Sequence, residues 1–172
     1  MAPDELPAEG AEPIASRALA GLARGFAFAG GGLLVALTGM SVVSIAGRTV
    51  LGTPLPGDFE LVQVGCGAAI AAFLPYCQLR RGNIIVDFFT VRAPRRVQAA
   101  LDALGALLLA AVMALLCWRA VDGMLTVKAA GEVSMIVGFP VWVGYAAIVP
   151  SLALAALVGL ATAWEAGKAV RG

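Results

Sequence analysis

Residues 58–90 read DFELVQVGCGAAIAAFLPYCQLRRGNIIVDFFT, a stretch that joins a long apolar run to a strongly basic loop. Its segment Leu61–Leu79 has 19 residues without a charge. About 20 apolar residues in a helix cross the roughly 30 Å of hydrocarbon in a bilayer. The pair Arg80 and Arg81 follows directly. The stretch therefore predicts a transmembrane helix whose end is marked by positive charge.

Three further segments have the length and composition of membrane spans. Gly25–Gly47 has 23 residues and no charge, and Val97–Trp118 has 22 residues with Asp102 as its single charge. Val133–Trp164 has 32 uncharged residues, too many for one span and too few for two spans joined by a turn. Its beginning is predicted to be a loop or an interfacial segment, with Pro140 in the first helical turn, where a missing N–H costs nothing.

The composition supports the same class of protein. The chain has 172 residues, of which 60% are hydrophobic and 13% are charged, whereas soluble domains average about 25% charged residues. We predict an all-α integral membrane protein, with one four-helix domain (residues 17–172) after a disordered acidic tail (residues 1–16). The first twelve residues carry four acids and no base, unlike the basic start of a signal peptide. The four predicted spans are about 25–47, 60–79, 95–118 and 140–164.

The positive charges alternate between the two sides of the predicted domain. Nine of the twelve Lys and Arg residues lie in the tails and in the loop between spans two and three, and three lie in the other loops. Because basic flanks stay in the cytoplasm, both termini and loop 80–96 are predicted to be cytoplasmic, with loops 48–60 and 119–139 outside. The bases of loop 80–96, predicted to fix topology and bind lipid headgroups, are Arg80, Arg81, Arg92, Arg95 and Arg96.

The same loop contains Asn83–Thr90, NIIVDFFT, whose apolar residues are too few to cross a bilayer. Flanking arginines would hold this segment at the headgroup layer, so a short amphipathic interfacial helix at about residues 83–90 is predicted. The alternative is an ordinary cytoplasmic turn whose bases bind lipid phosphate.

The few acids near the spans have structural interpretations. Asp58 follows Gly57 and is predicted to be the N-cap of span two, with Glu60 in the first turn, where the helix dipole favours an acid. The alternative for both acids is contact with a partner protein outside. Asp102, two turns into span three, is predicted to pair with Arg95 or Arg96, and a role in binding a coupling ion is the alternative.

Span four contains a second proline, Pro150, which follows Pro140 by ten residues and lies about 15 Å further along the helix. A kink near the middle of the bilayer is predicted there, because neighbouring helices can satisfy the carbonyl that proline leaves free. Trp142 and Tyr145 near the outer end, and Trp164 near the inner end, have the positions of interface anchors.

Residues for catalysis or for holding a cofactor are scarce. The chain has no histidine, and its three cysteines lie in apolar runs without the spacing of a metal site. We predict no metal, no cofactor and no catalytic residue, and the formal net charge of +1 gives no sign of a nucleic-acid partner. Ion-coupled carriers usually have ionisable groups or broken helices at the middle of the membrane. This chain has one off-centre acid and one predicted kink, which points to an accessory membrane subunit.

Two motifs, in this order, resemble the DctQ-like family, the small membrane subunit of tripartite ATP-independent periplasmic (TRAP) transporters. Residues 58–90 have an acid opening span two, then a base, a glycine, a polar residue and an aliphatic–Val–Asp run. Residues 131–157 have a serine, a helix start with proline and tryptophan, a tyrosine and a second proline. The matching residues are Glu60, Arg80 or Arg81, Gly82, Asn83, Val86 and Asp87, and then Ser134, Pro140, Trp142, Tyr145 and Pro150.

The resemblance implies a function that composition does not show. The small subunit is expected to scaffold a large multi-span permease, which takes up an organic acid from a periplasmic solute-binding protein and uses an ion gradient, with sodium as the coupling ion. The resemblance also implies a protein without enzymatic activity in the bacterial inner membrane, in contact with membrane lipids. The residues expected to have structural or assembly roles are Glu60, Gly82, Asp87, Asp102, Pro140, Trp142 and Pro150.

Two other classes of membrane protein are the alternatives. A self-sufficient four-span carrier of small molecules would need an acid at the membrane centre of span one, and Gly25–Gly47 has none. A membrane anchor of a redox complex would need ligands for its cofactor, and the lack of histidine argues against a haem anchor.

Overall fold

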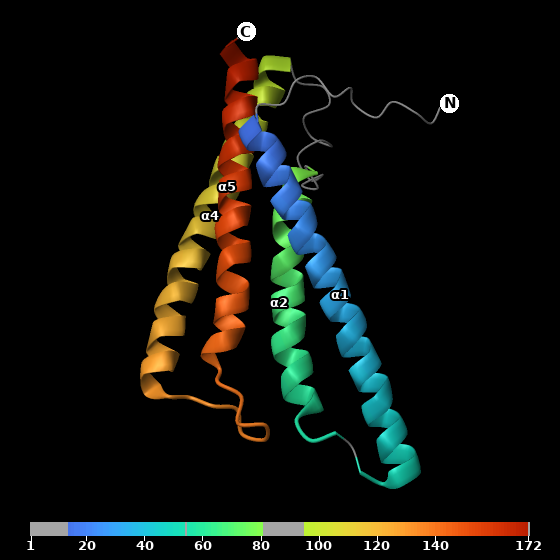
Figure 1. The fold of residues 1–172 in the computed structure, drawn as a ribbon. Helices are drawn as coiled ribbons and strands as arrows, with labels where there is room; N and C mark the ends of the chain where they lie inside the picture. Colours follow the sequence, from blue (N-terminus) through green and yellow to red (C-terminus); the bar gives the residue numbers. More distant parts are fainter. Residues whose placement is uncertain (1–13, 54, 81–94, 172) are drawn as a thin grey trace, which may run out of the picture.

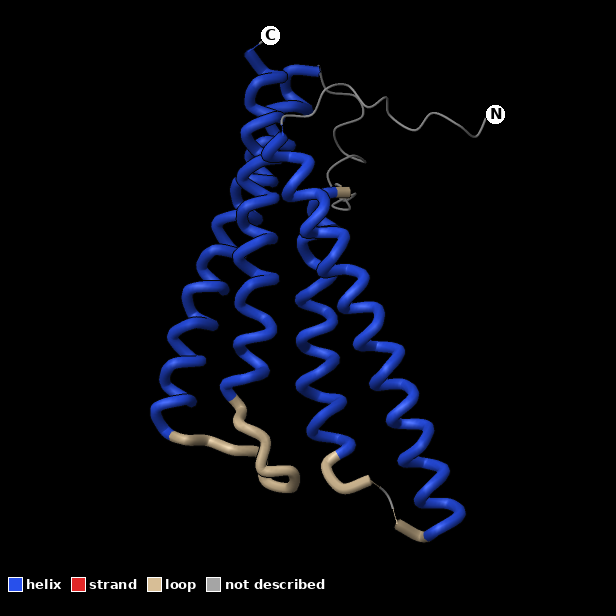
Figure 2. The backbone as a smooth tube through the Cα atoms, in the orientation of Figure 1, coloured by secondary structure: helices blue, strands red, loops and turns tan. Residues whose placement is uncertain are grey.

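The computed structural model describes residues 14–53, 55–80 and 95–171 of the chain. Within these ranges the protein is helical, apart from turns and one isolated β-bridge between Val133 and Pro140. Four helices are long and apolar enough to cross a membrane, which confirms the predicted fold class. Consecutive helices run in opposite directions, as Figures 1 and 2 show. They are α1 (Ile14–Leu51), α2 (Asp58–Leu79), α4 (Arg95–Ala130) and α5 (Trp142–Arg171).

Each helix extends beyond its predicted span at one end or both. Helix α1 has 38 residues, which corresponds to about 57 Å at 1.5 Å per residue, against about 30 Å of hydrocarbon. Basic side chains mark the edge of the apolar segments without ending the helices, because Arg and Lys are good helix formers. Left-handed glycines follow the last turns instead, with Gly52 (φ 70) after α1 and Gly131 (φ 65) after α4.

Helix α4 shows how such a glycine ends a helix. The N–H of Glu132 donates to the carbonyl of Val127 and the N–H of Gly131 donates to that of Lys128, both at 3.2 Å. This is a Schellman motif, which satisfies the last carbonyls of a helix and favours glycine at the left-handed position. Because the motif comes after Ala130, α4 continues for about three turns beyond the predicted end at Trp118.

The four helices lie in a row in the order α4, α5, α2, α1 (Figure 1). Helix α4 packs along α5, α5 against α2, and α2 along α1, whereas α1 and α5 share a short contact. The central helices α2 and α5 run parallel to each other and hold most of the buried side chains. We call the end where α1 begins and α5 ends the terminal end. The opposite end, with residues 52–57 and 131–141, is the loop end.

Contacts between α1 and α2 repeat every seven residues on both helices. A Cβ placed on Gly30 would lie 3.1 Å from the Cβ of Ala72, and one placed on Gly65 would lie 2.7 Å from Leu37. Close approach through glycine and a seven-residue period are features of tightly packed antiparallel helices. The contacts of this seam are Gly30 with Ala72, Leu37 with Gly65, and Ser44 with Asp58.

Small residues also set the contacts of α5 with its neighbours. A Cβ on Gly159 would lie 3.0 Å from the Cβ of Ala110 in α4, and one on Gly144 would lie 3.0 Å from Val64 in α2. The three helices can therefore approach closely without large side chains between them. Helix α5 continues through Pro150, and the kink there stays a prediction.

Candidate functional site

Polar contacts at the loop end gather around the first turn of α2. Gly57, in the left-handed conformation (φ 76), is the N-cap, and no side chain caps this helix start. The prediction that Asp58 is the N-cap was therefore wrong by one residue, because the chain turns into the helix through a glycine. The carboxylate of Asp58 instead accepts hydrogen bonds from the Ser44 hydroxyl of α1 and, at 2.7 Å, from the N–H of Phe59.

Glu60, also in the first turn of α2, reaches to the loop between α4 and α5. Its Oε1 accepts the N–H of Ile136 at 3.1 Å, and its Oε2 accepts the N–H of Val137 at 3.2 Å. Consecutive backbone N–H groups that point to one carboxylate form a small anion-binding nest. The side chain of Glu60 thus connects the α1–α2 hairpin to the α4–α5 hairpin.

The loop that Glu60 binds is a compact hairpin. The N–H of Ser134 donates to the carbonyl of Phe139 at 2.8 Å, and the N–H of Phe139 donates to the Ser134 hydroxyl at 3.2 Å. Pro140 pairs with Val133 in the β-bridge, so it lies before α5 and not in its first turn as predicted. Pro140 belongs to the second strand-like segment of this hairpin because it pairs with Val133. The helix therefore begins two residues later, at Trp142.

Gly57 contacts this hairpin directly. A Cβ at Gly57 would overlap the Cγ2 atom of Val137. Gly57 is buried and Val137 is partly exposed. The Val137 side chain therefore packs on the backbone of Gly57, beside the hydrogen bonds of Glu60. The first turn of α2 therefore touches α1 through Asp58 and the α4–α5 loop through both Gly57 and Glu60.

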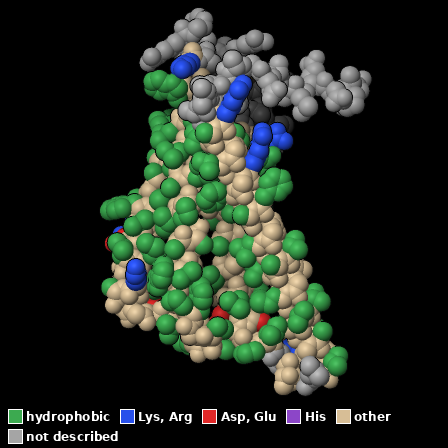
Figure 3. Space-filling model, viewed as in Figure 1, with side chains coloured by type: hydrophobic (Ala, Val, Ile, Leu, Met, Phe, Trp, Pro, Cys, Tyr) green, Lys and Arg blue, Asp and Glu red, His purple; other side chains and the backbone are tan. Residues whose placement is uncertain are grey.

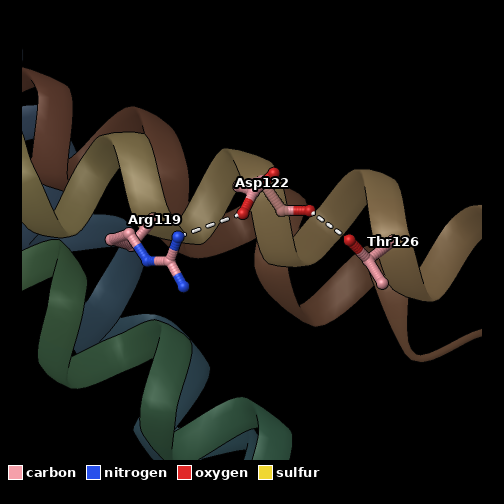
Figure 4. Close-up of polar contacts among 3 residues, drawn as sticks. All are labelled: Arg119, Asp122 and Thr126. Atoms are coloured by element: carbon pink, nitrogen blue, oxygen red, sulfur yellow. Dashed lines mark hydrogen bonds and ion pairs between the residues drawn. The ribbon is translucent and has the colours of Figure 1, made fainter.

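The extension of α4 at the loop end carries charged side chains. Arg119 forms an ion pair with Asp122 at 3.2 Å, and Thr126 donates to the backbone carbonyl of Asp122 at 2.9 Å (Figure 4). Lys128 lies further toward the end of the helix, with its ammonium 5.0 Å from the centre of the Trp142 ring. This cation–π contact ties the end of α4 to the start of α5, where Trp142 was predicted as an interface anchor.

Basic side chains gather at the terminal end, and Figure 3 shows them above a broad band without charge on the face in view. Arg80 follows the last residue of α2 and lies 5.7 Å from the Tyr76 ring centre. Lys168 lies 5.6 Å from the Trp164 ring centre. Both pairs place a cation beside an aromatic ring, the arrangement expected at a membrane interface.

Several predicted residues fall outside the described part of the chain. Arg95 and Arg96 are the first residues of α4, but their side chains lie outside the description, so their pairing with Asp102 stays a prediction. Asp102 itself is exposed on α4. The predicted interfacial helix at residues 83–90 and the residues Arg81, Gly82, Asp87 and Arg92 lie outside the described residues.

Among the described residues, no group of three or more His, Cys, Asp or Glu side chains could hold a metal ion. Two residues of this site were not predicted from the sequence. Ser44 of α1 contacts Asp58 of α2, and Val137 of the α4–α5 loop contacts Gly57. A signal for Ser44 was present in the sequence, because it follows Gly30 and Leu37 at intervals of seven residues. Val137 had no such signal, since its contact depends on the shape of a loop.

The helices, their apolar outer surfaces and the cations at the terminal end define a multi-pass α-helical membrane protein. Its sequence matches the family described as "Tripartite ATP-independent periplasmic transporters, DctQ component" over residues 37–168. The match covers most of the chain, including all of α2 and α4 and nearly all of α5, so the chain belongs to this family of small membrane components of TRAP transporters. No curated protein and no solved structure matches the chain.

Proposed function

We propose that this chain scaffolds a large multi-span permease in a TRAP transporter and has no enzymatic activity of its own. The permease would carry the organic acid and the coupling ion, with sodium as the expected ion, and a periplasmic solute-binding protein would deliver the substrate. The proposal rests on the family to which the chain belongs and on the uncovered outer helices of its fold.

The observation that carries the scaffold role is the contrast between the outer and central helices. Helices α1 and α4 form the two edges of the row and have a partner on one side. Phe28 and Val35, on the free side of α1, are 82% and 74% exposed, whereas Val158 of α5 is 2% exposed. The exposed apolar side chains of the two outer helices can contact both lipid and a larger membrane protein.

We propose that the terminal end faces the cytoplasm of a bacterium and that the chain lies in the inner membrane. The basic side chains at this end support the orientation, because Lys and Arg next to a span stay on the cytoplasmic side. The loop end, with the 131–141 hairpin, would then lie in the periplasm.

The solute-binding protein would meet the loop end in this orientation. Asp58 and Glu60 accept hydrogen bonds within the chain, so we assign them the role of shaping this surface. Met135 and Ile136 at the tip of the hairpin are 100% and 63% exposed. These apolar side chains are the groups that Glu60 holds in place for contact with a partner.

Purification of a tagged chain from its native host tests the proposal. We expect a large permease to co-purify with it. We also expect that permease and binding protein reconstituted without this chain have no ion-dependent uptake of an organic acid. Full uptake without this chain would rule out a required scaffold role. Uptake by this chain alone, without a permease, would favour a self-sufficient carrier.

A further inference from the structure

An apolar groove lies between α4 and α5 in the half of the bundle nearest the terminal end. Its volume is about 430 Å³. Four of its side chains, two on each helix, are between 50% and 70% exposed, so the groove opens on the outer surface of the bundle. The lining residues are Ala103, Leu104 and Leu107 of α4, and Leu160, Ala163 and Trp164 of α5.

Among the described side chains, Lys168 places a cation beside this groove. The ammonium of Lys168 is 5.6 Å from the centre of the Trp164 ring, which itself lines the groove. Lys168 is one helical turn closer to the terminal end than Trp164 and is the last residue of the apolar segment Trp142–Lys168, so we expect lipid headgroups at its depth. The nearest acid on α4, Asp102, lies about 100° or more around its helix from the lining positions. Glu165 of α5 lies about 60° around the helix from Lys168, but in the described part of the chain the two side chains form no ion pair.

We propose that the groove binds a phospholipid with an anionic headgroup, with one acyl chain along its apolar floor and the phosphate at Lys168. A basic side chain at the headgroup level complements lipid phosphate, and the uncharged lining complements the acyl chain. The inference rests on the membrane-spanning fold and is independent of the scaffold role.

Photo-crosslinking tests this proposal on the full-length chain, kept together with the membrane proteins that co-purify with it. The probe is phosphatidylglycerol with a diazirine in one acyl chain, in nanodiscs of phosphatidylcholine. We expect crosslinks to concentrate at the lining residues of α4 and α5. Lys168→Glu should reduce this labelling at least about fivefold, the equivalent of about 1 kcal/mol for one basic side chain at an anionic surface.

Two control comparisons make the test specific. Lys128→Glu reverses the other lysine that lies over a tryptophan, at the opposite end of the bundle, and should leave groove labelling unchanged. Ala163→Phe fills the groove and should reduce labelling by both the phosphatidylglycerol probe and a phosphatidylcholine probe with the same acyl chain.

Three results would overturn the proposal. The first is labelling spread evenly over the exposed apolar face of α4, including Leu115 and Leu116. The second is an equal effect of Lys168→Glu and Lys128→Glu. The third is a groove that is labelled in the chain alone but protected when its co-purifying proteins are present, because a protein side chain would then be the occupant.

Discussion

At the scale of single residues, Gly57 is constrained in two independent ways. Its φ of 76° lies in the left-handed region, and a Cβ on it would overlap Val137. Gly52 has a similar φ of 70°, but a Cβ on Gly52 would have no neighbouring atom within 4 Å. The two glycines therefore separate the effect of backbone conformation from the effect of close packing.

Gly52→Ala should destabilise the chain by about 1–2 kcal/mol, the cost of a left-handed non-glycine residue. Gly57→Ala should destabilise it further, because the new methyl group forces the hairpin away from α2. Thermal unfolding in detergent measures the stability of both variants. Adding Val137→Ala to Gly57→Ala removes the overlap, so the double variant should be about as stable as Gly52→Ala. Equal midpoints for the two single variants would show that the contact between Gly57 and Val137 is absent.

Glu60→Gln should loosen the hairpin that carries Met135 and Ile136. The amide keeps one acceptor oxygen but turns a donor group toward a backbone N–H, so one of the two hydrogen bonds is lost. We expect several-fold faster cleavage of the hairpin by an added protease. Glu132→Gln removes a neighbouring exposed acid and is the control, and equal cleavage of both variants would contradict the role of Glu60.

At the scale of elements, the sequence predicts the helices better than their ends and contacts. Long uncharged runs determine where hydrocarbon can lie, which is why all four spans could be located. The ends depend on left-handed glycines such as Gly52 and Gly131, and a chain with 21 glycines offers many candidate positions. Helix rotation decides which glycine meets a neighbour: Gly30 faces Ala72, whereas Gly31 and Gly32 have open space.

Gly30→Leu should separate α1 from α2, because its side chain would enter the space held by Ala72. We expect a loss of stability of about 1–3 kcal/mol, as for other overpacked interiors. Gly32→Leu is the matched control, two residues away with nothing within 4 Å. Unfolding of the isolated chain in detergent compares them, and equal stability of the two variants would contradict the observed rotation of α1.

At the scale of the whole molecule, charge is expected to fix the direction of the bundle in the membrane. Arg80→Glu combined with Arg81→Glu should invert or mix the topology and lower the yield of complex, because this loop holds five of the twelve bases. Cysteine labelling from each side of the membrane reads the topology. Lysines at both positions keep the charge and should restore it, and unchanged topology in the glutamate variant would contradict the proposal.

Asp102 is the remaining candidate for a direct role in ion coupling. It is exposed on α4 and, among the described residues, belongs to no group of three or more potential metal ligands. Asp102→Asn should therefore leave unchanged the sodium dependence that we propose for uptake by the assembled transporter. Asp122→Asn provides the comparison with an acid in an ion pair, and a changed sodium requirement in Asp102→Asn alone would support coupling.

The first turn of α2 also has a consequence for the order in which the protein is built. Synthesis proceeds from the N-terminus, so we expect the α1–α2 hairpin to enter the membrane before the segment with residues 131–141 has been made. In the proposed orientation, Glu60 and Gly57, which contact residues 136 and 137 in the folded chain, would already lie at the periplasmic surface when that segment crosses the membrane. We therefore expect the α4–α5 hairpin to dock onto a surface formed earlier, and the time at which Val137 first becomes protected would measure its arrival.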